Sequence, residues 1–483
     1  MKWCFLINDI DLMIEFFGKL SHHIQEEGDE CLLIFNSKIS EYRKRKFFSA
    51  DSFPCIKTIS KVDWLIKNYK EDKTDFNDVS WKEFFPTFER KSQYLKLDYS
   101  NSVKIVAQLC QFLKFVFETE KPDVVINEAP ANIFTEIAYH LCKKYNIVYL
   151  GFIGSRINGR LDFYDLEHTC SKYEKTFKEI KDIDISENER KFAIDFIKNF
   201  ISHKQLPPYM DFQIKNIQSG KINRIKRYIK EEQRMFFFWI RYIFERKQFA
   251  LFDYESIAVF KWIFTRPWFS FKKRFRLLLQ KSIFDRLNEN DKFFLFPLHL
   301  QPESSTSVLA TYFCDQLNTI KNIAFALPFP YKLYVKEHPS AVGTRTRNFY
   351  KEIKKLPNTV LVSSYENVEN LVKKSQGIIT LTSTLGMEAA LAGKLTYVLG
   401  NVFYAYHPLC RKVNSFEELR EKIREDLNKP IVKDLENINI RFIVSYFRNT
   451  IEGDVNENIK QNDANNYKAI YQGIKKMFLK NEK

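Results

Sequence analysis

The residues best suited to chemistry lie in a hydroxyl-rich loop near residue 380, between a short apolar strand and a helix expected at 386–392. The loop and the start of the helix carry Thr382, Ser383, Thr384, Gly386 and Glu388. Hydroxyl and backbone N–H groups at the N-terminus of a helix that follows a parallel strand can bind an anion. The pattern predicts a phosphate site, with Glu388 in the first helical turn accepting hydrogen bonds from ribose hydroxyls. Helix capping by the same hydroxyls is the alternative interpretation.

A histidine–proline pair ends an earlier apolar segment, in YVKEHP. His338 can donate a hydrogen bond to a phosphate oxygen, and Pro339 favours an extended backbone before it. Alone, the pair would indicate an ordinary turn. Combined with the hydroxyl-rich loop two strands later, it predicts a nucleotide-sugar site at the carboxyl edge of a parallel sheet, with Lys336 beside it.

A third polar loop, in FPLHLQPESST, follows the first strand expected in the same sheet. It brings His299, Gln301 and Glu303 to the same edge, where they are predicted to contact substrate. Ordinary helix-start chemistry at Ser304 or Ser305 is the alternative.

The elements that must position these loops alternate between strand and helix. In the N-terminal part the predicted strands are 2–8, 31–36, 124–126 and 148–152, and in the C-terminal part 293–298, 332–336, 359–362, 377–381 and 395–399. Alternation of this kind indicates βαβ units with parallel sheets. The predicted fold class is α/β, with two Rossmann-like domains facing a cleft, a basic aromatic helical middle segment and C-terminal helices.

The predicted division of the chain has four parts. An N-terminal Rossmann-like acceptor domain covers 1–171, a helical basic-aromatic segment 172–290, and a C-terminal Rossmann-like nucleotide-sugar-binding domain 291–412. Helices at 413–483, expected over 416–427 and 462–479, are predicted to pack back on the N-terminal domain. Residues 40–96 are expected to be irregular.

Composition and missing motifs argue against several classes of protein. The 483 residues include eight cysteines without a CxxC pair, which favours reduced thiols in the cytoplasm over disulfides or a zinc site. The sequence lacks a signal-peptide pattern and an uncharged apolar run of membrane-spanning length. It also lacks GxxxxGK[ST], HExxH and GxSxG motifs. Two DxD triplets are better explained by helix starts and solvation, so neither a metal nor a cofactor is predicted.

The net charge of +16 is concentrated in the middle of the chain. Residues 221–284 hold sixteen Lys and Arg against five Asp and Glu, a local net charge of +11, interleaved with Phe and Trp clusters. Basic residues mixed with large aromatic rings suit an anionic membrane surface. Burial of the rings in a core is the alternative. Nucleic acid is not a predicted partner, since no RNA-binding signature accompanies the segment.

Three segments together resemble a known family. FPLHLQPESS, YVKEHPSAVG and ITLTSTLGMEAALAGK, within roughly 292–405, are similar in order and spacing to the capsular polysaccharide biosynthesis family, which includes Kdo transferases of the GT-B fold. The His-Pro and Ser/Thr-loop motifs also resemble those of bacterial sialyltransferases that use CMP-sugars. The resemblance implies that His338 and Ser383 or Thr384 hold the donor phosphate, with Glu388 near the ribose.

The N-terminal half is expected to supply the acceptor site and the catalytic base. An inverting transferase needs a carboxylate or histidine within reach of the acceptor hydroxyl. Glu128, after the strand VVIN, is the first candidate, and Asp9 follows the first strand. Asp162 and Asp165 are expected in a polar loop, and Arg156 would bind an acidic acceptor. The alternative for Glu128 is an acid of a surface loop, and the alternative for Asp9 is a cap of the helix that follows it.

The resulting hypothesis is a glycosyltransferase. It would move Kdo or another acidic sugar from a CMP-activated donor to a capsular or lipid-linked glycan, at the inner face of the cytoplasmic membrane. The predicted partners are a nucleotide-sugar donor, a glycan or glycolipid acceptor and an anionic membrane surface. A non-catalytic scaffold of a capsule-assembly complex and a nucleotide-sugar epimerase of the same fold remain as alternatives.

Overall fold

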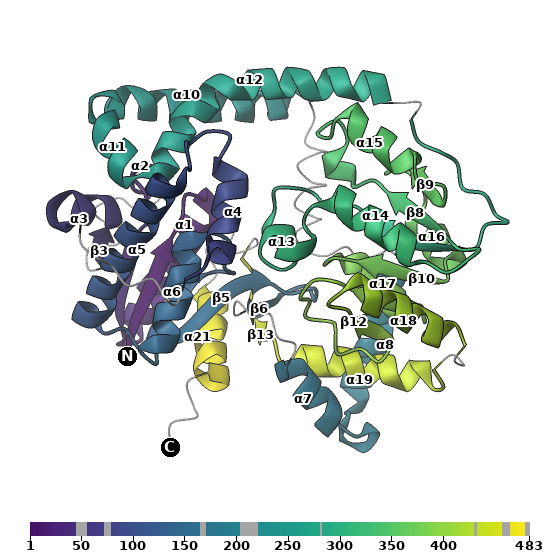
Figure 1. Ribbon diagram of the computed structural model, residues 1–483. Helices are drawn as coiled ribbons and strands as arrows, with labels where there is room; N and C mark the ends of the chain where they lie inside the picture. Colours follow the sequence, from purple (N-terminus) through teal and green to yellow (C-terminus); the bar gives the residue numbers. More distant parts are fainter. Residues whose placement is uncertain are drawn as a thin grey trace. The chain divides into compact units, whose positions relative to one another are not determined.

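Strands from the N-terminal and C-terminal parts of the chain form two separate sheets, each in its own unit (Figure 1). Unit 1 comprises Met1–Leu166, Pro207–Arg266 and Thr450–Lys483, and unit 2 comprises Glu167–Leu206 and Pro267–Asn449. The computed structural model describes residues 1–44, 56–71, 79–164, 171–202, 221–280, 283–428, 432–455 and 464–478.

The sheet of unit 1 has the strand order β13-β6-β5-β4-β1-β2-β3. Its strands are β1 (Lys2–Ile7), β2 (Glu30–Phe35), β3 (Lys57–Ser60), β4 (Val124–Glu128), β5 (Val148–Gly154), β6 (Arg160–Tyr164) and β13 (Ile451–Glu452). The pairs from β3 across to β5 are parallel, whereas β6 is antiparallel to both of its neighbours. The chain adds β2 and β3 on one side of β1 and returns to add β4 on the other, so the connections reverse direction between β1 and β4.

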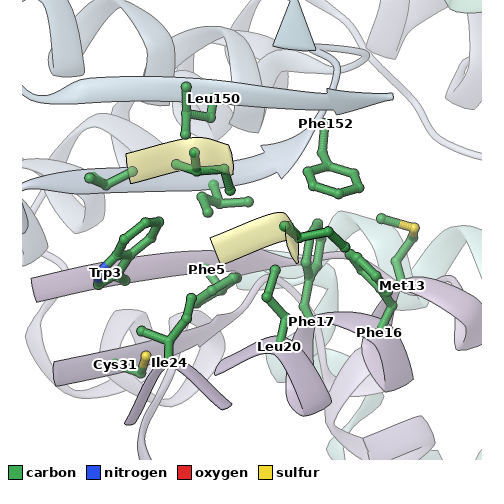
Figure 2. Packing of buried hydrophobic residues seen from close by; sticks show 14 of the residues in the cluster. Trp3, Phe5, Met13, Phe16, Phe17, Leu20, Ile24, Cys31, Leu150 and Phe152 are labelled. Carbon is green, nitrogen blue, oxygen red and sulfur yellow. The ribbon is translucent and has the colours of Figure 1, made fainter. Parts of the chain in front are cut away.

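Helices cover the sheet of unit 1 because its strands are apolar on both faces. They are α1 (Asp11–Glu26), α2 (Lys38–Lys44), α3 (Lys61–Asn68), α4 (Trp81–Lys91), α5 (Tyr99–Glu120), α6 (Ile133–Lys144) and α21 (Ala464–Phe478). Figure 2 shows Phe5 of β1 beside Phe17 and Leu20 of α1, and Trp3 and Phe16 belong to the same buried cluster. Alternate residues of β1 enter a second cluster with α5 and α6, as the two-residue period of a strand requires.

The sheet of unit 2 is parallel throughout, with the order β12-β11-β10-β7-β8-β9. Its strands are β7 (Phe293–Pro297), β8 (Lys332–Lys336), β9 (Thr359–Val362), β10 (Gly377–Thr380), β11 (Leu395–Val398) and β12 (Cys410–Lys412). The first strand, β7, lies between β8 and β10. The connections therefore reverse direction between β7 and β10, in the same way as between β1 and β4.

The helices of unit 2 connect and flank these strands. They are α7 (Ser171–Glu179), α8 (Glu187–Ile201), α13 (Ser304–Ser307), α14 (Gln316–Ala326), α15 (Arg347–Lys354), α16 (Val368–Lys374), α17 (Thr384–Leu391), α18 (Phe416–Leu427) and α19 (Leu435–Arg448). A short 3-10 turn, η4 (Pro339–Ala341), follows β8. Arg448 of α19 binds Glu189 of α8 with a bidentate ion pair, at 2.8 Å from Nε and 2.9 Å from Nη2.

The predicted fold class of two Rossmann-like α/β units is confirmed, and several local predictions are wrong. Residues 40–96 are not irregular, because the described part contains β3 and three helices. Ser60 and Ser80 mark the starts of α3 and α4 by accepting backbone N–H groups. The segment around Asp162 forms β6 rather than a polar loop, and α19 was not predicted.

The basic aromatic middle segment divides between the units. Helices α10 (Lys221–Tyr242) and α11 (Arg246–Phe252) belong to unit 1, and α12 (Tyr254–Gln280) passes into unit 2 at Pro267. Phe238, Tyr242 and Phe249 are buried against Ile39, so part of the aromatic content is core. Other large apolar side chains of α10 and α12 stay exposed: Phe236, Phe237, Ile240, Trp268, Phe269, Phe271 and Phe275.

A buried carboxylate anchors the middle segment to unit 1. Asp253, fully buried, accepts hydrogen bonds from Lys38 N at 2.8 Å, Ser256 N at 3.0 Å and Ser256 Oγ at 2.6 Å. Two residues further, Glu255 forms an ion pair with Lys91 of α4. These contacts fasten the start of α12 beside the strand ends of unit 1.

We predict that Asp253→Ala destabilises the protein by about 1.5–3 kcal/mol, the usual contribution of hydrogen bonds to a charged group. The buried donors Lys38 N and Ser256 N would lose their partner. Differential scanning fluorimetry should show a lower melting temperature than wild type. Asp182→Ala, at an exposed position of the 3-10 turn Asp182–Asp184, is the matched control and should melt like wild type. Equal melting of both variants would contradict the anchoring role.

Candidate functional site

Three loops of unit 2 lie at the carboxyl ends of adjacent strands β8, β7 and β10. The loop after β7 holds His299, the loop after β8 holds His338, and the loop after β10 holds Thr382 and Ser383. In open α/β sheets, ligands bind outside the carboxyl ends of the strands where the connections reverse direction. The three segments predicted from the sequence therefore meet at the expected position in this unit.

The loop after β8 is held by a buried carboxylate, Glu337. Its Oε1 accepts the backbone N–H of His338 at 2.6 Å, and its Oε2 accepts the hydroxyl of Tyr350 at 2.5 Å. Arg345 approaches the same carboxylate at 3.3 Å. Because three groups compensate a carboxylate that is only 1% exposed, the position of His338 relative to α15 is strongly determined.

Arg345 also joins the loop after β8 to the loop after β7. Its Nη2 donates to the carbonyl of His299 at 2.5 Å. The ring of His299 continues the connection, since its Nε2 accepts the backbone N–H of Thr382 at 3.1 Å. A path of hydrogen bonds therefore runs from Glu337 through Arg345 and His299 to Thr382, across three strand ends.

His299 is a neutral positioning group in this arrangement. Burial lowers its pKa to about 3, and the nearby charges of His338 and Arg345 act in the same direction. With Nε2 accepting from Thr382, the single proton of the neutral ring resides on Nδ1. Its direct contact is thus with the hydroxyl-rich loop, and the predicted contact of His299 with substrate stays a prediction.

His338 has a defined tautomer. Its Nδ1 accepts the backbone N–H of Ser340 at 3.2 Å, at the start of η4. Burial lowers the pKa of the ring, so the neutral form dominates at neutral pH. The neutral ring must then carry its proton on Nε2, which is the donor needed for a phosphate oxygen.

The hydroxyl-rich loop both caps α17 and is itself tightly held. Ser383 is the N-cap, and its Oγ accepts the N–H of Leu385 at 3.2 Å. The Ser383 N–H donates to Thr380 Oγ1 at 3.1 Å, and Thr382 Oγ1 donates to the Ser305 carbonyl at 2.8 Å. The N–H groups of residues 382 and 383 and the Thr382 hydroxyl thus already have protein partners.

Gly386 is required for close packing in this loop. A Cβ added there would lie 2.5 Å from the Tyr404 hydroxyl, which donates to the Ser383 carbonyl at 2.5 Å. Any larger residue would therefore displace the tyrosine that holds the cap.

Glu388 is the fifth residue of α17, so its predicted place in the first turn is wrong. The helix begins at Thr384, two residues earlier than the sequence suggested. Burial raises the pKa of the Glu388 carboxyl to about 8. At neutral pH it is mostly protonated and can both donate and accept a hydrogen bond.

Two other predicted residues of this edge bind protein groups. Lys336, with its pKa lowered by burial, donates from Nζ to the Ser364 carbonyl at 2.9 Å. Gln301 donates to the Cys314 carbonyl at 2.5 Å and accepts from Gln316 at 2.6 Å. These contacts shape the loops from within. Glu303 is instead exposed, accepts from Ser305 Oγ at 2.8 Å and lies close enough to His338 to influence its charge.

Unit 1 has its own polar group at the reversal point between β1 and β4. Glu128 ends β4 and accepts a hydrogen bond from Asn8 Nδ2, just beyond β1. Burial raises the pKa of Glu128 to about 7, the Asn8 hydrogen bond opposes this, and the charge of Asp9 adds to it. Asp9 follows β1 directly, and its carbonyl accepts from Arg43 at 2.5 Å.

The remaining predicted residues of unit 1 lie around the β5–β6 hairpin. Asp162 is fully buried within β6 and accepts the N–H of Phe163 at 2.8 Å, so its prediction as a loop acid was wrong. A strand was missed because RLDFY mixes polar and apolar residues. Arg156 lies half-buried in the turn of the hairpin. Asp165 lies outside the described residues.

Sequence reasoning did not assign roles to Glu337, Arg345, Tyr350, Asn8, Lys91 or Glu255. Glu337 stands next to His338, and its charge at a strand end was the one available signal. The others act through contacts between residues far apart in the sequence.

Comparison with known proteins supports the resemblance over one part of the chain. Residues 272–433 match the family model described as capsule polysaccharide biosynthesis protein. The matched segment covers about a third of the chain. It contains all three loops of the candidate site in unit 2. A search of curated proteins found no match.

Solved structures similar to the chain include transferases and epimerases. The KpsC beta Kdo 2,7 transferase of Thermosulfurimonas dismutans matches with 10% identity and a TM-score of 0.35, over 72% of this chain and 84% of the other. Its beta Kdo 2,4 transferase matches with 12% identity and a TM-score of 0.37, over 67% and 80%. The UDP-GlcNAc 2-epimerase of Neisseria meningitidis matches with 13% identity and a TM-score of 0.25, over 93% and 98%. With TM-scores this low, none of them bears on the activity of this chain.

Two further findings concern the described residues alone. They contain no group of three or more His, Cys, Asp or Glu side chains placed to hold a metal ion. Within the same ranges, no helix combines the length and apolar character needed to cross a membrane.

The raised pKa of Glu388 predicts a pH-dependent stability. The carboxyl releases its proton near its ordinary pKa of 4.5 when unfolded and near 8 when folded. Between these values the folded state binds more protons, so the free energy of unfolding falls as pH rises. Glu388→Gln should match wild type at pH 4.5 and melt about 2 °C or more higher at pH 9. Glu417→Gln, at an exposed position of α18, should show no such divergence, and a pH-independent difference for Glu388→Gln would contradict the assignment.

Proposed function

We propose that the protein is a glycosyltransferase of capsule or related surface-glycan synthesis, with its nucleotide-sugar donor bound in unit 2. The observation that carries this proposal is the convergence of three strand-end loops at the reversal point of the parallel sheet, inside the segment that matches the family model. The hydrogen-bond path from Glu337 to Thr382 orders these loops through contacts between protein groups. Such preorganisation reduces the entropy lost on binding.

In the proposed donor site, His338 and the hydroxyls of Ser383 or Thr384 bind the phosphate. The Nε2–H of the neutral His338 ring donates to a phosphate oxygen, and its tautomer is maintained by the Ser340 N–H. The protonated Glu388 carboxyl would bind ribose hydroxyls as donor and acceptor. The resemblance of the His-Pro and Ser/Thr motifs to those of sialyltransferases favours a CMP-activated acidic sugar.

In the proposed acceptor site of unit 1, Glu128 is the general base. A carboxyl with a pKa of about 7 is well matched to proton removal at neutral pH. Asn8 orients it through a hydrogen bond to Oε2. Asp9 is the second candidate, and Arg156 would contact an acidic acceptor. Asp162 is a weaker candidate because it is fully buried within β6.

We further propose that the protein works at the inner face of the cytoplasmic membrane. The family resemblance implies lipid-linked acceptors, and the net charge of +11 in 221–284 would attract an anionic leaflet.

The donor assignment predicts the effect of substitutions at His338. Wild type should bind CMP more tightly than UDP or GDP in isothermal titration calorimetry. His338→Ala should weaken CMP binding roughly tenfold or more, because a charge-assisted hydrogen bond is lost. His338→Gln, which retains an N–H donor near the Nε2 position, should keep more affinity than His338→Ala. His22→Ala, at an exposed histidine of α1, is the control. Unchanged CMP affinity in His338→Ala would exclude this donor site.

The base assignment predicts a separate effect on turnover. Glu128→Gln should leave CMP binding intact and lower turnover by roughly 10²–10⁴-fold, the usual contribution of a positioned general base. In wild type, turnover should rise with pH through about 7, as Glu128 becomes ionised. Glu30→Gln is the matched control, because Glu30 is an exposed glutamate at the start of β2, whereas Glu128 lies at the end of β4. Full activity of Glu128→Gln would transfer the role to Asp9, Asp162 or Asp165, or to a mechanism without a protein base. Conversion of the nucleotide sugar without an acceptor would identify an epimerase, and absence of any turnover in wild type would favour a scaffold.

A further inference from the structure

The part of α12 in unit 2 carries a stripe of exposed aromatic side chains. Trp268, Phe271 and Phe275 are 55%, 59% and 53% exposed. Their spacing of three and four residues places them along one face of the helix. The rings of Trp268 and Phe271 lie 5.8 Å apart and those of Phe271 and Phe275 6.5 Å apart, both nearly parallel. A contiguous row of exposed rings indicates a surface that another partner covers.

Basic side chains accompany the stripe. Lys272 places its ammonium 4.9 Å from the centre of the Trp268 ring, and Arg274, in the same stretch of helix, is exposed. Cationic groups next to aromatic rings match the headgroup region of an anionic membrane, where rings insert and cations meet lipid phosphates. Nucleic acid is a poorer match, because base stacking needs free ring faces and these rings stack on one another.

The same helix also holds the loop of the proposed donor site. Lys273 Nζ donates to the Ser340 carbonyl at 3.4 Å, and Arg276 Nη1 donates to the Thr344 carbonyl at 2.5 Å. The helix and loop are in close contact at Gly343, which has φ +79°. A Cβ there would lie 2.8 Å from both Leu277 Cγ and the Lys273 carbonyl.

This contact reaches the group that binds the donor in our proposal. Ser340, whose carbonyl faces Lys273, uses its N–H to maintain the tautomer of His338. Any restriction of α12 therefore restricts the loop that presents the His338 Nε2–H. The stripe and the loop contacts come from the same two turns of helix.

We propose that the stripe Trp268–Phe271–Phe275, with Lys272 and Arg274, docks on an anionic membrane surface, and that docking strengthens donor binding through Lys273 and Arg276. The coupling part rests on the proposed donor site, whereas the docking part does not. Because coupling between two binding sites is reciprocal, the donor nucleotide should strengthen lipid binding by the same factor.

Docking is tested with the full chain and vesicles of phosphatidylcholine, with and without 30 mol% phosphatidylglycerol. Wild type should co-sediment with the anionic vesicles, less so at high salt. Trp268→Ser/Phe271→Ser/Phe275→Ser should lower partitioning at least tenfold. The control Phe325→Ser/Phe329→Ser/Tyr365→Ser removes three exposed rings elsewhere in unit 2 and should bind like wild type. Equal partitioning of the stripe variant and wild type, or tighter binding of single-stranded RNA than of anionic vesicles, would overturn docking.

Coupling is tested by titrating CMP with and without the anionic vesicles. Wild type should bind CMP at least threefold more tightly in their presence. Lys273→Met/Arg276→Met keeps the stripe and should still co-sediment, but its CMP affinity should not respond to vesicles. A response equal to wild type in this variant, or none in wild type, would overturn coupling. Failure of CMP to bind under any condition would refute the donor assignment, while co-sedimentation would still decide docking.

Discussion

A buried carboxylate, Glu337, is the constraint on which the candidate site of unit 2 depends. Removing a carboxylate from water is unfavourable unless hydrogen bonds and an opposite charge compensate it. Here the His338 N–H, Tyr350 and Arg345 provide that compensation, and each belongs to a segment that must then stay in place. Arg345 extends the constraint to the His299 carbonyl, and the His299 ring extends it to Thr382. Three strand-end loops are thereby ordered as one group.

Burial also sets the charge of the titratable groups in the two candidate sites. It keeps His299 and His338 neutral and raises the pKa of Glu388 to about 8 and of Glu128 to about 7. A neutral histidine with one defined N–H, and carboxyls that hold or exchange a proton near neutrality, suit recognition of a nucleotide sugar and proton removal. Both units place these groups where the strand connections reverse direction, although their sequences around these points differ.

The middle segment shows how one composition can produce both buried and exposed aromatic rings. Phe238, Tyr242 and Phe249 are buried on unit 1, where Asp253 fastens the chain. The rings of Trp268 and Phe271 remain exposed on the second part of α12. The buried-core interpretation therefore holds for one part of the segment, whereas the rings of the other part stay exposed. Charge and aromatic content alone do not separate them, because separation depends on which helix face meets a packed neighbour.

The sequence by itself determined the features that a short stretch of residues encodes, namely the strands and the polar loops that follow them. Apolar strands followed by polar loops predicted the parallel sheets and brought His338, Ser383 and Thr382 to one edge, since carboxyl ends of parallel strands share that edge. The tertiary structure alone decided the contacts between distant residues. Examples are Asn8 with Glu128, Lys38 with Asp253 and Glu337 with Tyr350, separated by 120, 215 and 13 residues. Strand order and side-chain direction decide which residues pair, and burial in the folded chain raises the pKa of Glu128. None of these is a property of a short window, which is why β6 and the role of Glu337 became evident only in the folded chain.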